Sequence, residues 1–231
     1  MDNTPVKIFV GMDYKENVAY HTLTNSIIRK SSHPVSITAL TLKSIPSYNR
    51  PRDPKQSNEF SFTRFYVPWL CNYSGMAIYM DCDMLVRDGV DIIDIFKSID
   101  PMMSVSVCKH DYTPKGETKF LGTHQYQYPC KNWSSLMVFN CANYHSKRLD
   151  PEYINTAPAM DLHQFKWTNR IGELPKEWNW LVGEYEAVPS AKIAHFTLGG
   201  PYFKGNEDCD YASEWFEEYR NMTHCEQLVR P

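Results

Sequence analysis

The sequence predicts an α/β fold built on a mixed, mostly parallel sheet that is flanked by helices. The first observation is a strand–helix–strand succession over residues 6–40, which is the pattern of a βαβ unit and predicts parallel strands. The second is an apolar run at residues 76–80. A short run that is apolar at almost every position is typical of a strand buried on both faces of an α/β sheet.

Length and composition agree with a single domain over residues 1–231. The chain is 42% hydrophobic with a net charge of −3, which gives no electrostatic reason to expect nucleic acid or a membrane surface as a partner. No apolar stretch is as long as a membrane span, and the N-terminus lacks the basic and apolar regions of a signal peptide. Seven scattered cysteines without a CxxC pair are typical of reduced thiols. We therefore expect a cytoplasmic protein without a membrane span.

Elements of the N-terminal half follow from apolar periodicity. Strands are expected at residues 6–10, 35–40 and 76–80, with extended chain again at 84–86. Helices are expected at 20–30, at 59–70 with Pro68 as an irregularity, and from 92 to 96. Three prolines within residues 45–58 predict a loop. No Gly-rich phosphate loop follows the first strand, which disfavours dinucleotide oxidoreductases and P-loop enzymes.

The C-terminal half continues the alternation. Strands are expected at residues 104–107, 133–140 and 191–197. Residues 110–127 are polar and predict a loop on the acceptor side, and residues 171–181 predict an ordered loop packed by two tryptophans. Residues 151–167 are expected to be helical in part. An amphipathic helix over 211–228 closes the domain, with Trp215, Phe216 and Tyr219 on its inner side.

Two aspartates, Asp81 and Asp83, come directly after the buried strand. Open α/β sheets bind ligands at the carboxyl ends of their strands, so the position suits a site. Carboxylates two residues apart repel one another unless a cation or water lies between them, and hard oxygen ligands favour Mg²⁺ or Mn²⁺. The same spacing also occurs by chance, so an ordinary loop with two acids is the alternative on spacing alone.

Residues far along the chain could extend this site. His195 lies near the end of a strand and is either a third metal ligand or a structural histidine. Gly199 and Gly200 could present N–H groups to a diphosphate whose charge Lys204 would neutralise. Arg64 is either a phosphate ligand or a surface side chain whose guanidinium reaches into water.

Other candidates have two interpretations each. Asp13 either accepts hydrogen bonds from a ribose or base or caps the helix that follows. Trp133 is either a platform for a sugar or a packing residue. Asp161, His163 and Gln164 cluster on or near the partly helical stretch, where a solvated helix end is the alternative.

The order of these blocks resembles the nucleotide-sugar glycosyltransferases of the GT-A fold, and among them family eight, the glycogenin and galactosyltransferase-like enzymes. Four blocks carry the resemblance: Val10-Gly11-Met12-Asp13, Phe62-Thr63-Arg64, YMDCDMLV from Tyr79, and HFTLGGP from His195. Residues 162–183 also resemble a bacterial and viral branch of that family. The resemblance covers most of the chain and implies a GT-A (Rossmann-like) fold.

The resemblance also implies roles for single residues. Asp81, Asp83 and His195 match a site for a divalent ion, Mn²⁺ or Mg²⁺. Residues implied on the donor side are Val10, Gly11, Asp13, Tyr14, Arg64, Asp81, Cys82, Gly199, Gly200 and Lys204. Trp133, His163 and Gln164 fall on the acceptor side, and Asp161 joins Asp81, Asp83 and Arg64 as a candidate for catalysis. Two departures stand out: Lys204 comes nine residues after the histidine, later than the family's lysine, and Leu162 after Asp161 breaks the family's Asp-Gln pair.

The implied function is a metal-dependent transfer of a hexose from a nucleotide sugar, a UDP-sugar, to a hydroxyl acceptor with retention of configuration. A sugar nucleotidyltransferase is one alternative, but such enzymes favour a Gly-rich basic loop that residues 11–15 do not provide. A non-catalytic glycan-binding module is another, and the acidic pair together with His195 and its diglycine argues against it. The sequence predicts neither the acceptor nor the oligomeric state.

Overall fold

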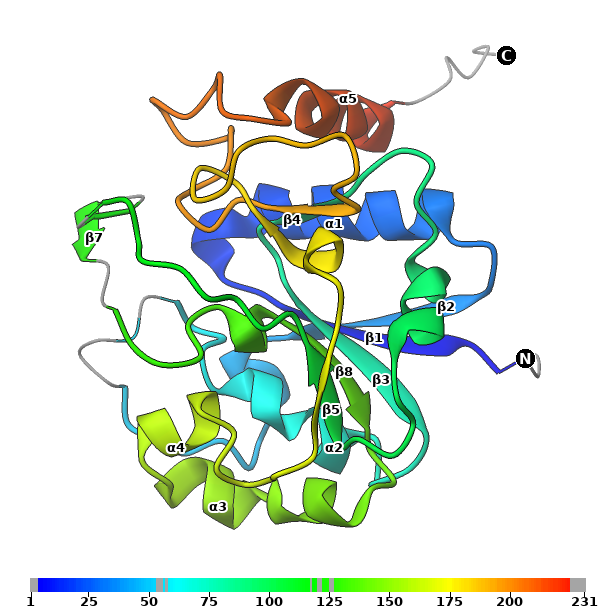
Figure 1. Cartoon of the computed structure of the whole chain (residues 1–231), viewed down its shortest axis with the longest axis vertical. Coiled ribbons are helices and arrows are strands. Elements are labelled where there is room, and N and C mark those ends of the chain that lie inside the picture. Colours follow the sequence, from blue (N-terminus) through cyan, green and yellow to red (C-terminus); the bar gives the residue numbers. More distant parts are fainter. Residues whose placement is uncertain are drawn as a thin grey trace, which may run out of the picture.

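A six-stranded sheet forms the centre of the molecule (Figure 1). The computed structural model describes residues 4–52, 56, 58–116, 118–119, 122–124 and 127–224. The strand order is β2-β1-β3-β8-β5-β9. These strands are β1 (Val6–Gly11), β2 (Val35–Leu40), β3 (Met76–Asp81), β5 (Val105–Val107), β8 (Leu136–Asn140) and β9 (Ile171–Glu173).

The sheet is mixed and mostly parallel, as the sequence predicts. β1 runs parallel to both β2 and β3, and β5 runs parallel to β9. Only β8 is antiparallel to its two neighbours, β3 and β5. The βαβ unit is confirmed, because α1 (Asn17–Lys30) connects the parallel strands β1 and β2.

Both faces of the sheet are buried, which explains the uninterrupted apolar run in β3. Ile78 and Met80 pack with Leu23 and Ile27 of α1, whereas Ala77 and Tyr79 pack on the opposite face. Successive side chains of a strand point to opposite faces, so a strand covered on both sides needs apolar residues at every position. The opposite face is covered by α2 (Val67–Leu70), α3 (Pro151–Thr156) and α4 (Ala159–His163), which lie below the sheet in Figure 1.

A second, three-stranded sheet continues from the end of β3. It has the order β10-β11-β4, formed by β10 (Trp180–Leu181), β11 (Ile193–His195) and β4 (Met84–Val86). Trp215 of α5 (Ala212–Thr223) packs against Leu85, Ala194 and Phe196 of this region. The turn at residues 82–83 is therefore where the chain passes from the large sheet to the small one.

Several predicted boundaries were wrong. The helix expected over 59–70 is confined to a 3₁₀ turn at Thr63–Tyr66 and α2, and Pro68 lies in the first turn of α2, where its missing N–H is not needed. The stretch 133–135 is a 3₁₀ turn before β8. Residues 171–181 are not a loop throughout, because they contain β9, a 3₁₀ turn and β10.

The remaining differences are smaller. The strand expected over 191–197 is limited to β11, and residues 92–98 form a 3₁₀ helix. The loop expected at 110–127 includes a short hairpin of β6 (Thr118–Lys119) and β7 (Thr123–His124), and part of that stretch lies outside the described residues. The C-terminal helix ends at Thr223, and residues 225–228 of its predicted range also lie outside them. Within the described part of the chain, no helix is both long and apolar enough to cross a membrane.

Candidate metal and donor site

Asp81, Asp83 and His195 meet at the junction of the two sheets. Asp81 ends β3, Asp83 follows two residues later, and His195 ends β11. Antiparallel pairing of β4 with β11 places His195 opposite Met84, which brings its ring to the acidic turn. One ligand atom from each of the three residues lies within 4.8 Å of the others, and the distance from His195 Nε2 to Asp83 Oδ1 is 3.4 Å. The structure thus brings together the three residues that the sequence suggested as metal ligands.

The ring of His195 is held by hydrogen bonds on the side away from the aspartates. Its Nδ1 lies 2.9 Å from Asn179 Oδ1, an acceptor, so Nδ1 carries the proton and Nε2 presents its lone pair to the carboxylates. Asn179 Nδ2 in turn donates to Ser135 Oγ at 2.9 Å. His195 is only 2% exposed. This arrangement, in which the second nitrogen of a histidine is fixed by a neighbour, is typical of metal-ligating histidines.

Asp81 is held by two other side chains. Arg64 Nη2 lies 3.0 Å from Asp81 Oδ1, and the Tyr79 hydroxyl donates to the same oxygen at 2.7 Å. Burial raises the pKa of Asp81 and the neighbouring Asp83 raises it further, whereas Arg64 lowers it. Two buried carboxylates beside one guanidinium leave excess negative charge, which a divalent cation would balance.

The donor set therefore fits a hard divalent ion. Two carboxylates and one imidazole nitrogen are ligands that Mn²⁺ and Mg²⁺ accept in proteins, and the set leaves coordination positions for a substrate. The fit rests on the grouping of three ligand atoms and on the tautomer that Asn179 imposes on His195.

Arg64 is not a surface side chain. It is 5% exposed, and its Nη1 donates to the carbonyl of Ser134 at 2.8 Å in addition to the ion pair with Asp81. Its cationic group also lies 5.1 Å from the centre of the Tyr79 ring. The interpretation in which its guanidinium reaches into water is therefore wrong, and its role toward a donor phosphate stays a prediction.

The first strand reaches the same edge of the sheet. Gly11 pairs with Asp81 across β1 and β3, and a Cβ at Gly11 would lie 2.4 Å from the Tyr79 hydroxyl oxygen and 2.7 Å from the Phe60 ring. Glycine is therefore required here for the packing that holds Tyr79 against Asp81. Both carboxylate oxygens of Asp13 accept backbone N–H groups, from Lys15 at 3.0 Å and Glu59 at 3.2 Å, which makes Asp13 a helix cap.

The remaining donor-side candidates differ in accessibility. Val10 and Cys82 are fully buried, and Tyr14 is 60% exposed. Gly199 has a φ of 112°, a conformation that favours glycine, and its N–H donates to the Phe196 carbonyl at 2.8 Å. Gly200 is covered by the Tyr202 ring, whose hydroxyl donates to Glu16 Oε2 at 2.7 Å. Lys204 is exposed on the same loop. Their contacts to a donor stay predictions.

The acceptor-side candidates are held by the protein itself. Trp133 donates its indole N–H to the His110 carbonyl at 2.8 Å, and its ring packs against the core of the large sheet. His163 lies between Phe62 and Phe65, and its Nδ1 lies 3.0 Å from Ser134 Oγ. Burial, with smaller effects of Arg64 and Arg50, lowers the pKa of His163 to about 3.

Asp161 lies in the first turn of the short helix α4, and Gln164 is its C-cap. The carboxylate of Asp161 pairs with Lys166 at 2.6 Å, and Gln164 follows the last residue of the helix. This is the geometry of the solvated helix end that the sequence left as the alternative. A role in catalysis for Asp161 or in acceptor binding for Gln164 stays a prediction.

Comparison with known proteins places the chain in a family. The protein named Protein CDI of Arabidopsis thaliana is 40% identical over 227 residues, which cover 94% of this chain and 87% of that protein. The chain belongs to the Protein CDI family. No protein-family model matches it. A bacterial or viral branch, suggested by residues 162–183, stays a prediction.

Solved structures with a similar fold are glycosyltransferases. GlyE of Streptococcus pneumoniae TIGR4 has a TM-score of 0.63 at 14% identity, covering 94% of this chain and 60% of GlyE. The bifunctional glycosyltransferase WbbM has a TM-score of 0.60 at 13% sequence identity, and the match covers 96% of this chain and 50% of WbbM. The galactosyltransferase LgtC, solved with donor and acceptor sugar analogues, has a TM-score of 0.58 at 9% sequence identity, and the match covers 96% of this chain and 98% of LgtC. At these identities the likeness establishes the GT-A fold for this member of the Protein CDI family.

Sequence reasoning missed three residues of the site. Asn179 and Ser135 orient His195, and Tyr128 is close enough for Arg64 and Asp81 to act on its pKa, which burial raises. Asn179 lies between two tryptophans in a stretch interpreted as a loop, and Ser135 was noted only as a small polar residue at a strand's start. The signal that could have identified Asn179 is a polar residue flanked by aromatic core residues, since a buried amide needs a partner.

Proposed function

We propose that this protein is a metal-dependent glycosyltransferase that moves a hexose from a nucleotide sugar, a UDP-sugar, to a hydroxyl acceptor. The observation that carries the proposal is the grouping of Asp81, Asp83 and His195 within 4.8 Å at the edge of a GT-A sheet. The GT-A fold alone supports a nucleotide-sugar donor only by analogy with other enzymes of this fold, because one fold can carry different functions. The choice of UDP and of retention of configuration rests on the family resemblance of the motifs.

Each residue of the site has a role in this reaction. Asp81, Asp83 and His195 would hold the ion, which when bound supplies Lewis-acid stabilisation of the negative charge on the leaving diphosphate. Arg64 holds Asp81 in place through an ion pair and keeps a cationic group beside the same charge. Asn179 keeps the lone pair of His195 Nε2 directed at the ligand position.

The reaction exchanges one bond at the anomeric carbon. The bond from this carbon to the diphosphate oxygen breaks, the oxygen of the acceptor hydroxyl bonds to the carbon, and the acceptor proton leaves to solvent or to the diphosphate. Gly199, Gly200 and Lys204 are proposed to contact that diphosphate, and Val10, Gly11, Asp13, Tyr14 and Cys82 to lie along the nucleotide.

The first test is a thermal-shift panel of nucleotide sugars with and without Mn²⁺, followed by a measurement of UDP release. A ligand that binds only the folded state raises its stability, so a UDP-sugar should raise the Tm with Mn²⁺ and lose that effect with a chelator. Asp83→Asn should lower the rate of UDP release by at least about 100-fold, since the ion supplies several kcal/mol. Asp100→Asn, an exposed acid away from the cluster, is the matched control.

The outcomes separate the three classes of function. UDP release that depends on metal and on Asp83 supports the transferase. Turnover that requires pyrophosphate would instead support a sugar nucleotidyltransferase. Glycan binding without any turnover would support a binding module, and full activity of Asp83→Asn would contradict the metal assignment.

A further inference from the structure

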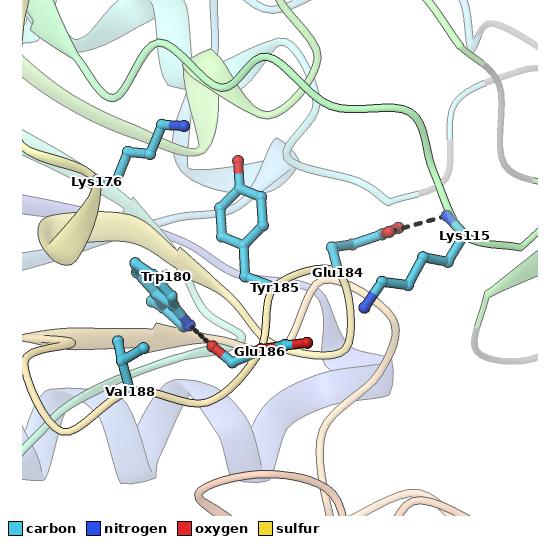
Figure 2. Close-up of a pocket in the computed structure, with 7 residues that line it drawn as sticks. All are labelled: Lys115, Lys176, Trp180, Glu184, Tyr185, Glu186 and Val188. Carbon is cyan, nitrogen blue, oxygen red and sulfur yellow. Dashed lines mark hydrogen bonds between the residues drawn. The ribbon is translucent and has the colours of Figure 1, made fainter.

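A surface groove of about 510 Å³ lies beside the small sheet. Figure 2 shows its seven lining residues: Lys115, Lys176, Trp180, Glu184, Tyr185, Glu186 and Val188. Most of them come from β10 and the turn that follows it. The volume is within the range of sites that hold small molecules, and none of these residues belongs to the metal cluster.

The strand β10 connects the groove with the metal cluster. β10 runs parallel to β11, with Leu181 opposite His195, and the N–H of Val182 donates to the His195 carbonyl at 2.9 Å. Asn179, the residue before Trp180, holds the His195 ring. The strand that lines the groove is therefore the strand that positions the third ligand of the metal cluster.

A second connection runs through His110. Its Nδ1 lies 2.9 Å from the Tyr185 hydroxyl, and it is only 5% exposed. Burial, with smaller effects of His195 and Lys176, lowers the pKa of His110 to about 3. A neutral His110 thus contacts the groove through Tyr185, and it lies near enough to His195 for that residue to affect its pKa.

The aromatic side chains of the groove are fixed in orientation. The Trp180 and Tyr185 rings meet edge to face at 5.3 Å, and the indole N–H of Trp180 donates to the Glu186 carbonyl at 3.1 Å. Both rings are only partly buried. A partly exposed, rigid aromatic pair offers the apolar surface on which the C–H face of a pyranose packs, at little cost in side-chain entropy.

The charges around the rings balance. Two lysines, Lys115 and Lys176, stand against two acids, Glu184 and Glu186. In Figure 2 the Tyr185 hydroxyl points between Lys176 on one side and Glu184 on the other. The Glu184 carboxylate is buried and accepts the Lys115 backbone N–H at 3.0 Å, so the exposed charged groups are Lys115, Lys176 and Glu186. Ammonium groups donate hydrogen bonds and carboxylates accept them, so these groups suit the hydroxyl groups of an uncharged sugar. A ligand with several negative charges would meet no net attraction here.

We propose that this groove binds an uncharged saccharide, and that this saccharide is the acceptor of the transfer reaction. The second part rests on the proposed glycosyltransferase function, and the first does not. The non-reducing end of an oligosaccharide lying on Trp180 and Tyr185 would extend past His110 toward the metal cluster. The acceptor is thus a glycan, and its hydroxyl-bearing end is recognised by stacking and by neutral hydrogen bonding.

The binding experiment uses the whole chain without donor or metal. Saturation-transfer NMR is recorded with a panel of lactose, maltose, cellobiose and mannobiose. At least one disaccharide should give a signal that falls at least 10-fold in Trp180→Ala and is retained in Trp180→Phe, because phenylalanine keeps a stacking face. Tyr144→Ala removes an aromatic ring that is 79% exposed elsewhere, and it should behave as the wild type. Unfolding curves of each variant establish that it is folded.

The acceptor experiment follows transfer from a UDP-sugar to the disaccharide that binds. Trp180→Ala and Lys176→Ala should raise the acceptor KM at least 10-fold. If no disaccharide binds, or if binding is unaffected by Trp180→Ala and Lys176→Ala, the groove is not a saccharide site. If transfer occurs but the acceptor KM is unchanged in both variants, the acceptor assignment is overturned while the glycosyltransferase proposal stands. Saccharide binding without any donor turnover would support the groove and contradict the proposed activity.

Discussion

At the scale of single residues, the amide of Asn179 decides the chemistry of His195. Because Asn179 Oδ1 accepts from Nδ1, the lone pair of Nε2 is directed at Asp83, 3.4 Å away. Without this acceptor the imidazole could place a proton on Nε2, and the nitrogen could then not ligate a cation. Asn179 contacts no substrate in this arrangement, so it is a positioning residue.

We expect Asn179→Leu to weaken Mn²⁺ binding by about 10- to 100-fold, the range typical of partners that orient a ligating histidine. The measurement is a titration of free Mn²⁺ by electron paramagnetic resonance. Asn155→Ala is the control, since the Asn155 amide donates to the Ser47 carbonyl and belongs to α3. Asn179→Asp keeps an acceptor at Oδ1 and should retain most of the affinity. Equal affinities of the wild type and Asn179→Leu would contradict the role of Asn179.

The candidate metal ligands could be predicted from the sequence, but the residues that orient them could not. Asp81 and Asp83 stand out because they follow a buried strand directly, and His195 because it ends another strand before a diglycine. Asn179 and Ser135 give no such signal, because their role depends on contacts between residues far apart in the chain. Asn179 is 44 residues from Ser135 and 16 residues from His195. For Asp161 the structure shows an ion pair with Lys166, and its role in catalysis stays a prediction.

At the scale of elements, the site depends on the turn at which the chain leaves the large sheet and enters the small one. β3 ends in the large sheet at Asp81, and β4 begins in the small sheet at Met84. The apolar run of β3 predicts a buried strand, and this prediction was correct. Two- and three-residue strands such as β10 and β11 carry too little periodicity to predict their partners, so the small sheet, and with it the groove, could not be foreseen.

The C-terminal helix is anchored to α1 through a buried acid. Glu218 is 2% exposed, accepts from Asn25 Nδ2 at 2.5 Å and lies 3.0 Å from Lys30 Nζ and 3.1 Å from Arg29 Nη1. Removal of one partner from a buried ion pair leaves an uncompensated charge and costs about 3–5 kcal/mol. The α5 helix covers the small sheet with Trp215, so this anchor also supports the region around His195.

We expect Glu218→Ala to lower the free energy of unfolding by about 3 kcal/mol, the low end of that range because Arg29 is partly exposed. Urea unfolding monitored by tryptophan fluorescence measures the change. Glu217→Ala removes the exposed neighbour on the same helix and should change the free energy by less than about 0.5 kcal/mol. A loss below about 1 kcal/mol for Glu218→Ala would show that the pair does not anchor α5.

At the scale of the whole molecule, folding buries histidines in their neutral form. Burial, with smaller effects of the neighbouring His195 and Lys176, lowers the pKa of His110 to about 3. A histidine in the unfolded chain has a pKa near 6.5. Between these two values the unfolded state binds a proton that the folded state does not, so stability rises with pH in this window and is lost as the pH falls below about 6.5. His163, whose pKa burial also lowers to about 3, contributes in the same direction.

The expected loss for His110 between pH 6.5 and pH 5 is about 2 kcal/mol, since each pKa unit corresponds to about 1.4 kcal/mol. Urea unfolding at pH 7.5, 6.5 and 5.0 in a chelator measures this dependence without a metal contribution. His110→Asn keeps a polar group toward the Tyr185 hydroxyl but cannot be protonated. The loss of stability of this variant over the same interval should therefore be smaller than that of the wild type by about 2 kcal/mol. His21→Gln replaces an exposed histidine and should keep the pH dependence of the wild type. If His110→Asn and the wild type lose stability in parallel, the proton that drives acid unfolding binds elsewhere and the neutral state of His110 is not a determinant of stability.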